Sequence, residues 1–144
     1  AENIYYESRN EDIRGQFAVG FVTLNRVNDD RFPKTVCNVV KQANIHRVTK
    51  KVVCAFSWYC ENDKKGKEIP IKNPDGTINQ RVVDQFQVAS IVALQILSGE
   101  VKDNTNDATH FHNPYTSRPT WRLEMTRTMT IGNHNFYKIP DTKE

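Results

Sequence analysis

Residues 7–27 read ESRNEDIRGQFAVGFVTLNRV, and this segment sets the architecture of the chain. Two glutamates precede a nearly continuous apolar run. The apolar positions recur at three- and four-residue steps and are Ile13, Phe17, Gly20, Phe21, Leu24 and Val27. That spacing is typical of an α-helix with a buried face. The segment therefore predicts a central core helix with carboxylates at its mouth.

Glu7 and Glu11 are the chemically informative residues of this segment. If the first turn begins near Tyr5 or Tyr6, the two glutamates share one side of the helix, with Cβ atoms about 5–6 Å apart. Close like charges raise the pKa of one carboxyl, and packing of the tyrosines around Glu7 adds desolvation with the same sign. A carboxylic acid that stays protonated near neutral pH can act as a general acid.

Capping is the structural alternative for these acids, because carboxylates near a helix N-terminus stabilise the free N–H groups and the helix dipole. We expect this role for Glu11 and Asp12. Glu7 lies too early to cap the same helix. Spacing alone leaves its catalytic and structural roles equally open.

Five motifs in order resemble the SleB-like cell wall hydrolase family, typified by spore-cortex-lytic enzymes. They are E-x-R-x-E at 7–11, F-P-x-T-V-C at 32–37, CAFSWYC at 54–60, ATHFHN at 108–113 and IGNHNF at 131–136. Together they span most of the chain. A series of this length and order is far more specific than any single motif.

The resemblance implies an α+β, lysozyme-like domain, mainly helical with a small β-hairpin. It also implies cleavage of peptidoglycan glycan strands between N-acetylmuramic acid and N-acetylglucosamine, by a lytic transglycosylase. The family's catalytic glutamate is the first of E-x-R-x-E, which is Glu7 here. Ser8, Asn10 and Ala55 depart from the family pattern. Asn10 can adopt the left-handed conformation that glycine permits, whereas Ala55 lacks an amide expected to contact substrate.

We expect further residues to bind substrate or support the site. Trp58 and Tyr59 are expected to line the cleft, and His110 and His112, two apart on a strand, to point to one face. Either histidine would hydrogen-bond substrate or hold the loop near Glu7. The full set of supporting residues is Glu11, Gln16, Trp58, Tyr59, His110, His112 and Asn113.

Three other functions remain as alternatives. A muramidase would hydrolyse the same bond with a second carboxylate, for which Glu11 or Asp107 is available. A zinc-dependent amidase would use His110, His112 and His134, although no H-E-x-x-H spacing is present. A non-catalytic wall-binding module would need no carboxyl among tyrosines. We therefore expect Glu7 catalysis with no metal and no cofactor.

Composition fits one domain over residues 1–144. The net charge of +3 and the isoelectric point near 8.8 favour approach to an anionic surface such as a bacterial wall. The mean hydropathy of -0.67 argues against a membrane-embedded chain. No apolar run reaches the length of about 18 residues that a membrane span requires, so we expect no membrane insertion. We also expect a monomer without a nucleic-acid partner. AENIYY has neither a charged n-region nor an apolar h-region, so we expect that an export signal has been removed or never existed. We expect a secreted, periplasmic or wall-bound enzyme, or a phage lysis enzyme made in the host cytoplasm.

Three cysteines allow one disulfide, and the sequence leaves all pairings among Cys37, Cys54 and Cys60 open. The remaining segments predict local structure. We expect a helix over 32–42 that starts at Pro33, a strand or loop over 43–56, and a surface loop over 64–79 with a Pro-Asp-Gly turn. A core helix over 82–97 ends before Gly99. A β-hairpin turns at Gly132-Asn133.

Overall fold

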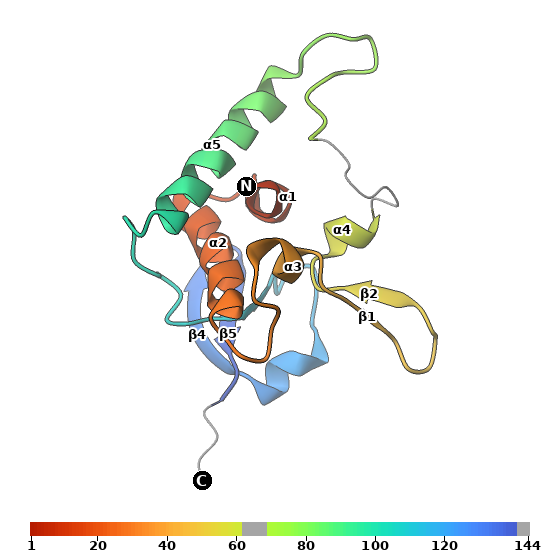
Figure 1. The fold of residues 1–144 in the computed structure, drawn as a ribbon, viewed down its shortest axis with the longest axis vertical. Helices are drawn as coiled ribbons and strands as arrows, with labels where there is room; N and C mark the ends of the chain where they lie inside the picture. The colour runs from red at the N-terminus through yellow and green to blue at the C-terminus, as the bar shows by residue number, and fades with distance from the viewer. Residues whose placement is uncertain (62–68, 141–144) are drawn as a thin grey trace.

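The computed structural model describes residues 1–61 and 69–140, which form five α-helices, one 3₁₀ helix and five strands (Figure 1). In chain order they are α1 (Glu2–Ser8), α2 (Ile13–Val27), α3 (Val36–Val40), β1 (Ala43–Ile45), β2 (Val52–Cys54), α4 (Ser57–Glu61), α5 (Gln80–Leu97), β3 (His110–His112), η1 (Thr120–Glu124), β4 (Thr126–Ile131) and β5 (His134–Lys138). The α+β class predicted from the sequence is confirmed.

Helix α2 forms the centre of the molecule, as its apolar spacing predicts. Ala18, Val19 and Val22 are fully buried. One face of α2 contributes to a cluster with α1 and α5, and another packs on the C-terminal strands. The side chain of Asp12 accepts a hydrogen bond from the backbone N–H of Gly15 at 3.1 Å, which fixes the N-terminus of the helix.

The prediction that Glu7 and Glu11 share one helix is wrong. Glu7 belongs to α1, which ends at Ser8, and Glu11 lies in the turn before α2. The Ser8 hydroxyl donates to the carbonyl of Ile4 at 2.7 Å, and the cap formed by Asp12 starts a new helix. The two glutamates are therefore brought together by a turn between helices.

Helix α5 follows the prediction in its bounds but not in its burial. Asn79 caps its N-terminus, and Gly99 after its C-terminus has a φ of +78°. Ala89, Val92 and Ile96 are buried against α1 and α2. The opposite face is open to solvent, with Ile91 56% and Leu94 68% exposed. The helix therefore covers one side of the core rather than lying within it.

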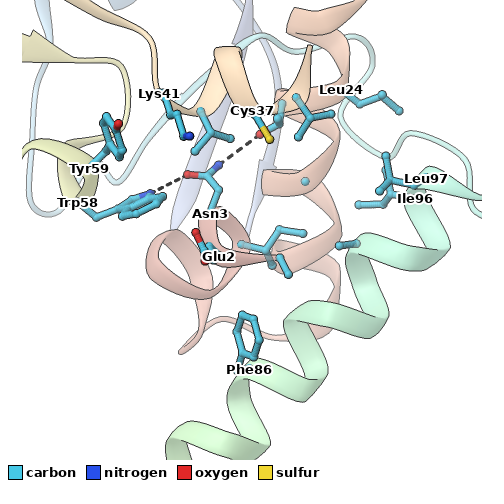
Figure 2. A pocket seen from close by; sticks show the side chains of 17 residues that line it. Glu2, Asn3, Leu24, Cys37, Lys41, Trp58, Tyr59, Phe86, Ile96 and Leu97 are labelled. Atoms are coloured by element: carbon cyan, nitrogen blue, oxygen red, sulfur yellow. Dashed lines mark hydrogen bonds between the residues drawn. The ribbon is translucent and has the colours of Figure 1, made fainter. Parts of the chain in front are cut away.

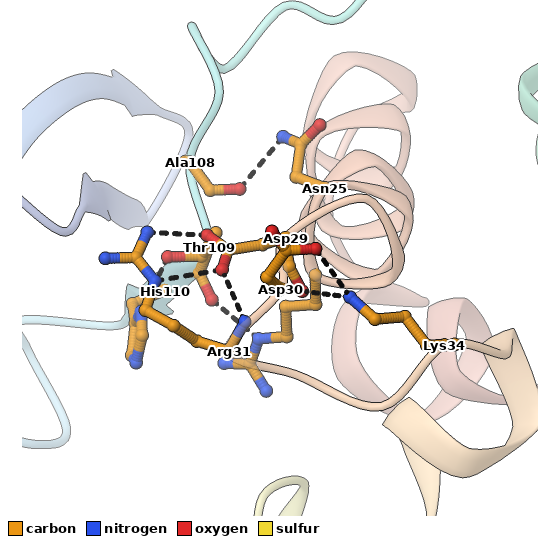
Figure 3. A network of polar contacts seen from close by, with 9 residues as sticks. Asn25, Asp29, Asp30, Arg31, Lys34, Ala108, Thr109 and His110 are labelled. Atoms are coloured by element: carbon orange, nitrogen blue, oxygen red, sulfur yellow. Dashed lines mark hydrogen bonds and ion pairs between the residues drawn. The ribbon is translucent and has the colours of Figure 1, made fainter.

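Helix α3 is shorter than the expected helix over 32–42. Thr35 caps it by accepting from the backbone N–H of Asn38 at 3.2 Å, so Pro33 lies outside the helix. Within α3, Val39 is fully buried, whereas Val36 is 38% exposed. The residues before α3 form an ionic loop instead, in which Asp29 accepts two hydrogen bonds from the Arg31 side chain (Figure 3).

The segments expected to be a strand or loop (43–56) and a surface loop (64–79) contain regular structure in the residues that the structure describes. Residues 43–54 form the antiparallel hairpin β1–β2, which projects from the body of the molecule (Figure 1). The predicted turn at Pro74-Asp75-Gly76 is present, with the backbone N–H of Asn73 bonded to the carbonyl of Thr77 at 2.8 Å. The first part of the predicted loop, 64–68, lies outside the described residues.

The C-terminal hairpin is also confirmed, and it gains a third strand. Strands β3 and β4 both pair antiparallel with β5, in the order β3-β5-β4. Gly132 supplies the positive φ, +57°, that the two-residue turn requires. The buried face of this sheet packs through Ile131 and Phe136 on Ala18 and Val22 of α2.

The cysteine pairing left open by the sequence is Cys54 with Cys60, which links β2 to α4. Cys37 is an exposed free thiol on α3. In the part of the chain that the structure describes, no helix combines the length and apolar character needed to cross a membrane.

Candidate active site

A polar cleft of about 250 Å³ lies where α1 turns into α2. Two loops of the sheet complete it, the one after β3 and the β4–β5 turn. Its lining residues are Tyr6, Glu7, Ser8, Arg9, Asn10, Glu11, Asn113, Asn133 and His134. The fold therefore brings together three of the sequence-predicted site residues, Glu7, Glu11 and Asn113.

Glu7 lies in the last turn of α1 and is half-buried. The neighbouring tyrosines have separate roles. Tyr6 lines the cleft, and its ring stacks on Trp58 with centroids 4.6 Å apart. Tyr5 is 3% exposed and packs in the helical core instead. Only one of the two tyrosines therefore flanks the carboxyl as predicted.

Arg26 of α2 supplies a buried positive charge to this region. Its guanidinium lies 5.1 Å from the ring centroids of both Phe32 and Phe56, and its Nε donates to the carbonyl of Thr109 at 2.7 Å. Burial lowers the pKa of Arg26 to about 10, and the negative charge of Glu7 acts in the opposite direction. The charge of Glu7 thus acts on a cation that packs on two aromatic rings.

Glu11 pairs with His134 across the cleft. Its Oε1 lies 3.2 Å from Nδ1 of His134, and the two side chains are only 14% and 10% exposed. The two atoms are close without the alignment of a hydrogen bond, since Nδ1 has no such partner among the described residues. Burial lowers the pKa of His134, and the charge of Glu11 opposes this shift. The expected capping role belongs to Asp12 alone.

Gln16 supports Glu11 from within α2 rather than lining the cleft. It is 6% exposed, and its Nε2 donates to the backbone carbonyl of Glu11 at 3.3 Å. Its Oε1 is buried without a hydrogen-bond partner in residues 1–61 and 69–140. Gln16 therefore fixes the turn that carries Glu11.

His110 and His112 share one face of β3, as predicted, but this face turns away from the cleft. Both rings contact Trp121, with centroids 5.1 and 5.8 Å away. The ring nitrogens of His112 lie 3.1 Å from the carbonyl of Ser117 and 2.9 Å from the hydroxyl of Tyr137. His112 thus holds the loop that presents Asn113, which is one of its two predicted roles.

The zinc alternative lacks a ligand set in the described part of the chain. Strand pleating places His110 and His112 on one face of the sheet, whereas His134 packs on Phe111 and pairs with Glu11 on the other. Within residues 1–61 and 69–140, no three His, Cys, Asp or Glu side chains are grouped so that they could hold a metal ion.

Trp58 and Tyr59 do not line the Glu7 cleft. They border a second, largely apolar pocket of about 740 Å³ between the helices (Figure 2). The Trp58 Nε1 donates to Oδ1 of Asn3 at 2.8 Å, and Asn3 in turn donates to the Thr23 hydroxyl at 3.3 Å. Trp58 reaches the cleft only indirectly, through its stacking on Tyr6.

Helices packed around α2, a small antiparallel sheet and a glutamate at a helix end facing a polar cleft together define a lysozyme-like α+β domain. The chain belongs to the cell wall hydrolase family, whose model, described as Cell Wall Hydrolase, matches residues 10–137. Glu7 lies three residues before this match.

Solved and curated relatives agree with this assignment. The catalytic domain of the germination-specific lytic transglycosylase SleB from Bacillus anthracis superposes with a TM-score of 0.65 at 29% identity, covering 94% of this chain and 88% of that one. The SleB catalytic domain of Bacillus cereus gives 0.62 at 28% identity, covering 94% and 84%. The spore cortex-lytic enzyme of Halalkalibacterium halodurans is 28% identical over 94% of this chain. The chain spans only 32% of that relative's length.

Proposed function

We propose that this chain cleaves peptidoglycan glycan strands between N-acetylmuramic acid and N-acetylglucosamine, as a lytic transglycosylase with Glu7 as its acid and base. The observation that carries the proposal is the position of Glu7, at the end of α1 and in a polar cleft shared with Asn113 and His134. The similarity to SleB catalytic domains supports the same chemistry.

The mechanism needs one carboxyl that works in both directions. Protonated Glu7 donates its proton to the glycosidic oxygen as the bond to C1 of muramic acid breaks. The resulting carboxylate then accepts the proton of the muramoyl C6 hydroxyl as that oxygen attacks C1. This hydroxyl is held close to C1 by the sugar itself, and water cannot match its effective concentration. The product is a 1,6-anhydro sugar.

Glu11 favours this route over hydrolysis. A muramidase needs a second carboxylate that is free to act on water or on C1. The second carboxylate of the cleft is Glu11, which is only 14% exposed and whose Oε1 lies 3.2 Å from Nδ1 of His134. Asp107, the other candidate, is not among the residues that line the cleft and belongs to a loop held by Asn25 of α2.

We also propose that residues 1–144 act as one monomeric domain outside the cytoplasm, because the substrate of this family lies in the cell wall. The proposed reaction in the cleft is the same whether the chain comes from a phage or from a bacterium. Size-exclusion chromatography with light scattering tests the monomer directly.

Replacing Glu7 with glutamine tests the proposal. Glu7→Gln keeps the size of the side chain but cannot donate the proton, so lysis of purified peptidoglycan should fall by about 10² to 10⁴-fold. The variant should stay folded, with the melting temperature lowered by at most a few degrees through the lost charge near Arg26. Glu2→Gln is the matched control, since it removes an exposed carboxylate from the same helix. Near wild-type lysis by Glu7→Gln would exclude Glu7 from the mechanism.

Mass spectrometry of the released fragments separates the reactions. A transglycosylase yields 1,6-anhydromuramic ends, lighter by one water than hydrolysis products and without new reducing ends. Reducing muramic acid would identify a muramidase, and Glu11→Gln should then abolish activity. Reducing glucosamine ends or free peptides would contradict cleavage of this bond altogether.

A further inference from the structure

The positive charge of the chain is concentrated in one segment. Residues 31–60 contain no Asp or Glu, and they carry six of the 20 Lys and Arg residues. These are Arg31, Lys34, Lys41, Arg47, Lys50 and Lys51. Because the whole chain has a net charge of only +3, the remaining residues are net negative. Half of these cations lie at the tip of the β1–β2 hairpin.

Aliphatic side chains are exposed beside these cations. Ile45 and Val52 are paired across the two strands and are 69% and 61% exposed, and Val48 in the connecting turn is 83% exposed. Exposed aliphatic residues scattered singly are ordinary, but a cluster at the end of a projecting element indicates an interaction surface. We call Ile45, Arg47, Val48, Lys50, Lys51 and Val52 the hairpin tip.

The hairpin tip has a defined conformation. Nδ1 of His46 accepts hydrogen bonds from the backbone N–H groups of Val48 and Thr49, both at 3.2 Å. The backbone N–H of His46 donates to the carbonyl of Lys51 at 2.8 Å, and Lys50 adopts a φ of +61°. These contacts fix the conformation of the turn, in which the side chains of Arg47, Val48 and Lys50 are all exposed.

The base of the hairpin is fixed to the body. The Cys54–Cys60 disulfide ties β2 to α4, and the backbone N–H of Ala55 donates to the carbonyl of Gln42 at 2.8 Å. The hairpin tip therefore projects away from the helical core, and the base of the hairpin is held rigidly on the body of the molecule (Figure 1). An anchored stem lowers the conformational entropy lost when the tip binds a surface.

We propose that the hairpin tip binds the surface of a membrane containing anionic phospholipids, with Val48, Ile45 and Val52 entering the interface. Basic side chains gain from the negative surface potential, and aliphatic side chains gain from leaving water. Residues 43–54 contain no Trp, Tyr or Phe, the side chains on which sugar rings or bases would stack. The combination of cations and aliphatic side chains matches lipid better than a polysaccharide or nucleic acid.

Vesicle cosedimentation tests this surface. We expect the chain to bind vesicles with about one third phosphatidylglycerol at least tenfold more tightly than pure phosphatidylcholine. The triple variant Arg47→Ala/Lys50→Ala/Lys51→Ala should lose about 100-fold of this binding. Arg81→Ala/Lys102→Ala/Arg127→Ala is the matched control, because it removes the same charge from exposed positions elsewhere and should bind nearly as the parent does.

The variant Val48→Ser distinguishes binding to a lipid surface from binding to a soluble polyanion. Loss of a partly inserted valine should weaken vesicle binding about fivefold, while leaving binding to a soluble polyanion, double-stranded DNA, unchanged. Equal effects of both triple variants would overturn the proposal, because general charge would then explain binding. Tight DNA binding with no preference for anionic vesicles would also overturn it. The vesicles contain no peptidoglycan, so the result is independent of glycan cleavage.

Discussion

At the scale of single residues, the contact between Glu11 and His134 depends on a glycine in the β4–β5 turn. Gly132 has a φ of +57°, and a Cβ atom there would lie 3.2 Å from Oε2 of Glu11. We predict that Gly132→Ala loses about 1 kcal/mol of unfolding free energy through backbone strain. It should also displace the Glu11 carboxylate and lower wall lysis, measured by turbidity, about tenfold.

Gly76→Ala provides the control for this prediction. Gly76 also has a positive φ, +88°, but no atom of the described residues 1–61 and 69–140 lies within 4 Å of the added Cβ. It should show the same loss of stability with unchanged lysis. If both variants lyse the wall equally well, the position of the Glu11 carboxylate has no bearing on turnover.

The residues of the cleft differ in how far the sequence predicts them. Glu7 and Asn113 follow from motifs whose local order is visible in the chain. The pairing of Glu11 with His134 does not, because it joins a turn near the N-terminus to a hairpin near the C-terminus. Helix spacing indicated a cap for Glu11, and only the packing of the sheet on α2 brings an imidazole to it. The predicted position of Trp58 in the cleft is wrong for a similar reason. Its neighbours in sequence do not reveal the hydrogen bond that it donates to Asn3, which lies 55 residues earlier in the chain.

At the scale of elements, α1, α2 and α5 meet at Gly20. A Cβ atom at this position would lie 2.4 Å from Cδ1 of Ile96 and 3.1 Å from Cδ1 of Ile4. Alanine favours a helix by about 1 kcal/mol over glycine, but the overlap should outweigh this gain. We predict that Gly20→Ala lowers the unfolding free energy by about 1–3 kcal/mol, measured by urea denaturation.

A second substitution shows whether the overlap is the cause. Ile96→Val removes the Cδ1 atom that the new methyl group meets. The double variant Gly20→Ala/Ile96→Val should therefore be less destabilised than the sum of the single variants, by about 1 kcal/mol. Strict additivity would place the effect of Gly20→Ala elsewhere than at the contact between α2 and α5.

Elements with strong periodicity and caps were predictable, and elements fixed by tertiary contacts were not. Helices α2 and α5 carry both signals. The break between α1 and α2 has neither glycine nor proline, so the cap at Asp12 was the only local mark of it. The β1–β2 hairpin remained ambiguous because its valines do not alternate with polar residues, and the structure exposes them. Apolar spacing overestimates the burial of α5, because it does not distinguish a helix that covers one side of the core from a helix enclosed within it.

At the scale of the whole molecule, the half-buried His110 and the buried His134 link stability to pH. Burial lowers the pKa of His110 to about 4, and the charges of Arg26 and Arg31 add to this shift while Asp29 opposes it. Burial likewise lowers the pKa of His134. Each ring takes up a proton more readily in the unfolded chain, where its pKa is near 6.5. Stability should therefore be complete above about pH 6.5 and fall as the pH approaches 4.

We predict that the free energy of unfolding at pH 5 is lower than at pH 7, with about 1–2 kcal/mol of the difference due to His110 after allowance for its partial exposure. Asp29, with a pKa of about 2, does not titrate in this window. His110→Gln should shrink the difference between the two pH values, whereas His46→Gln, at an exposed position, should leave it unchanged. Urea titrations at both pH values measure this directly. A stability that rises on acidification would show that protonated His110 is favoured in the folded chain, against the effect of its burial among Trp121, Phe32 and two arginines.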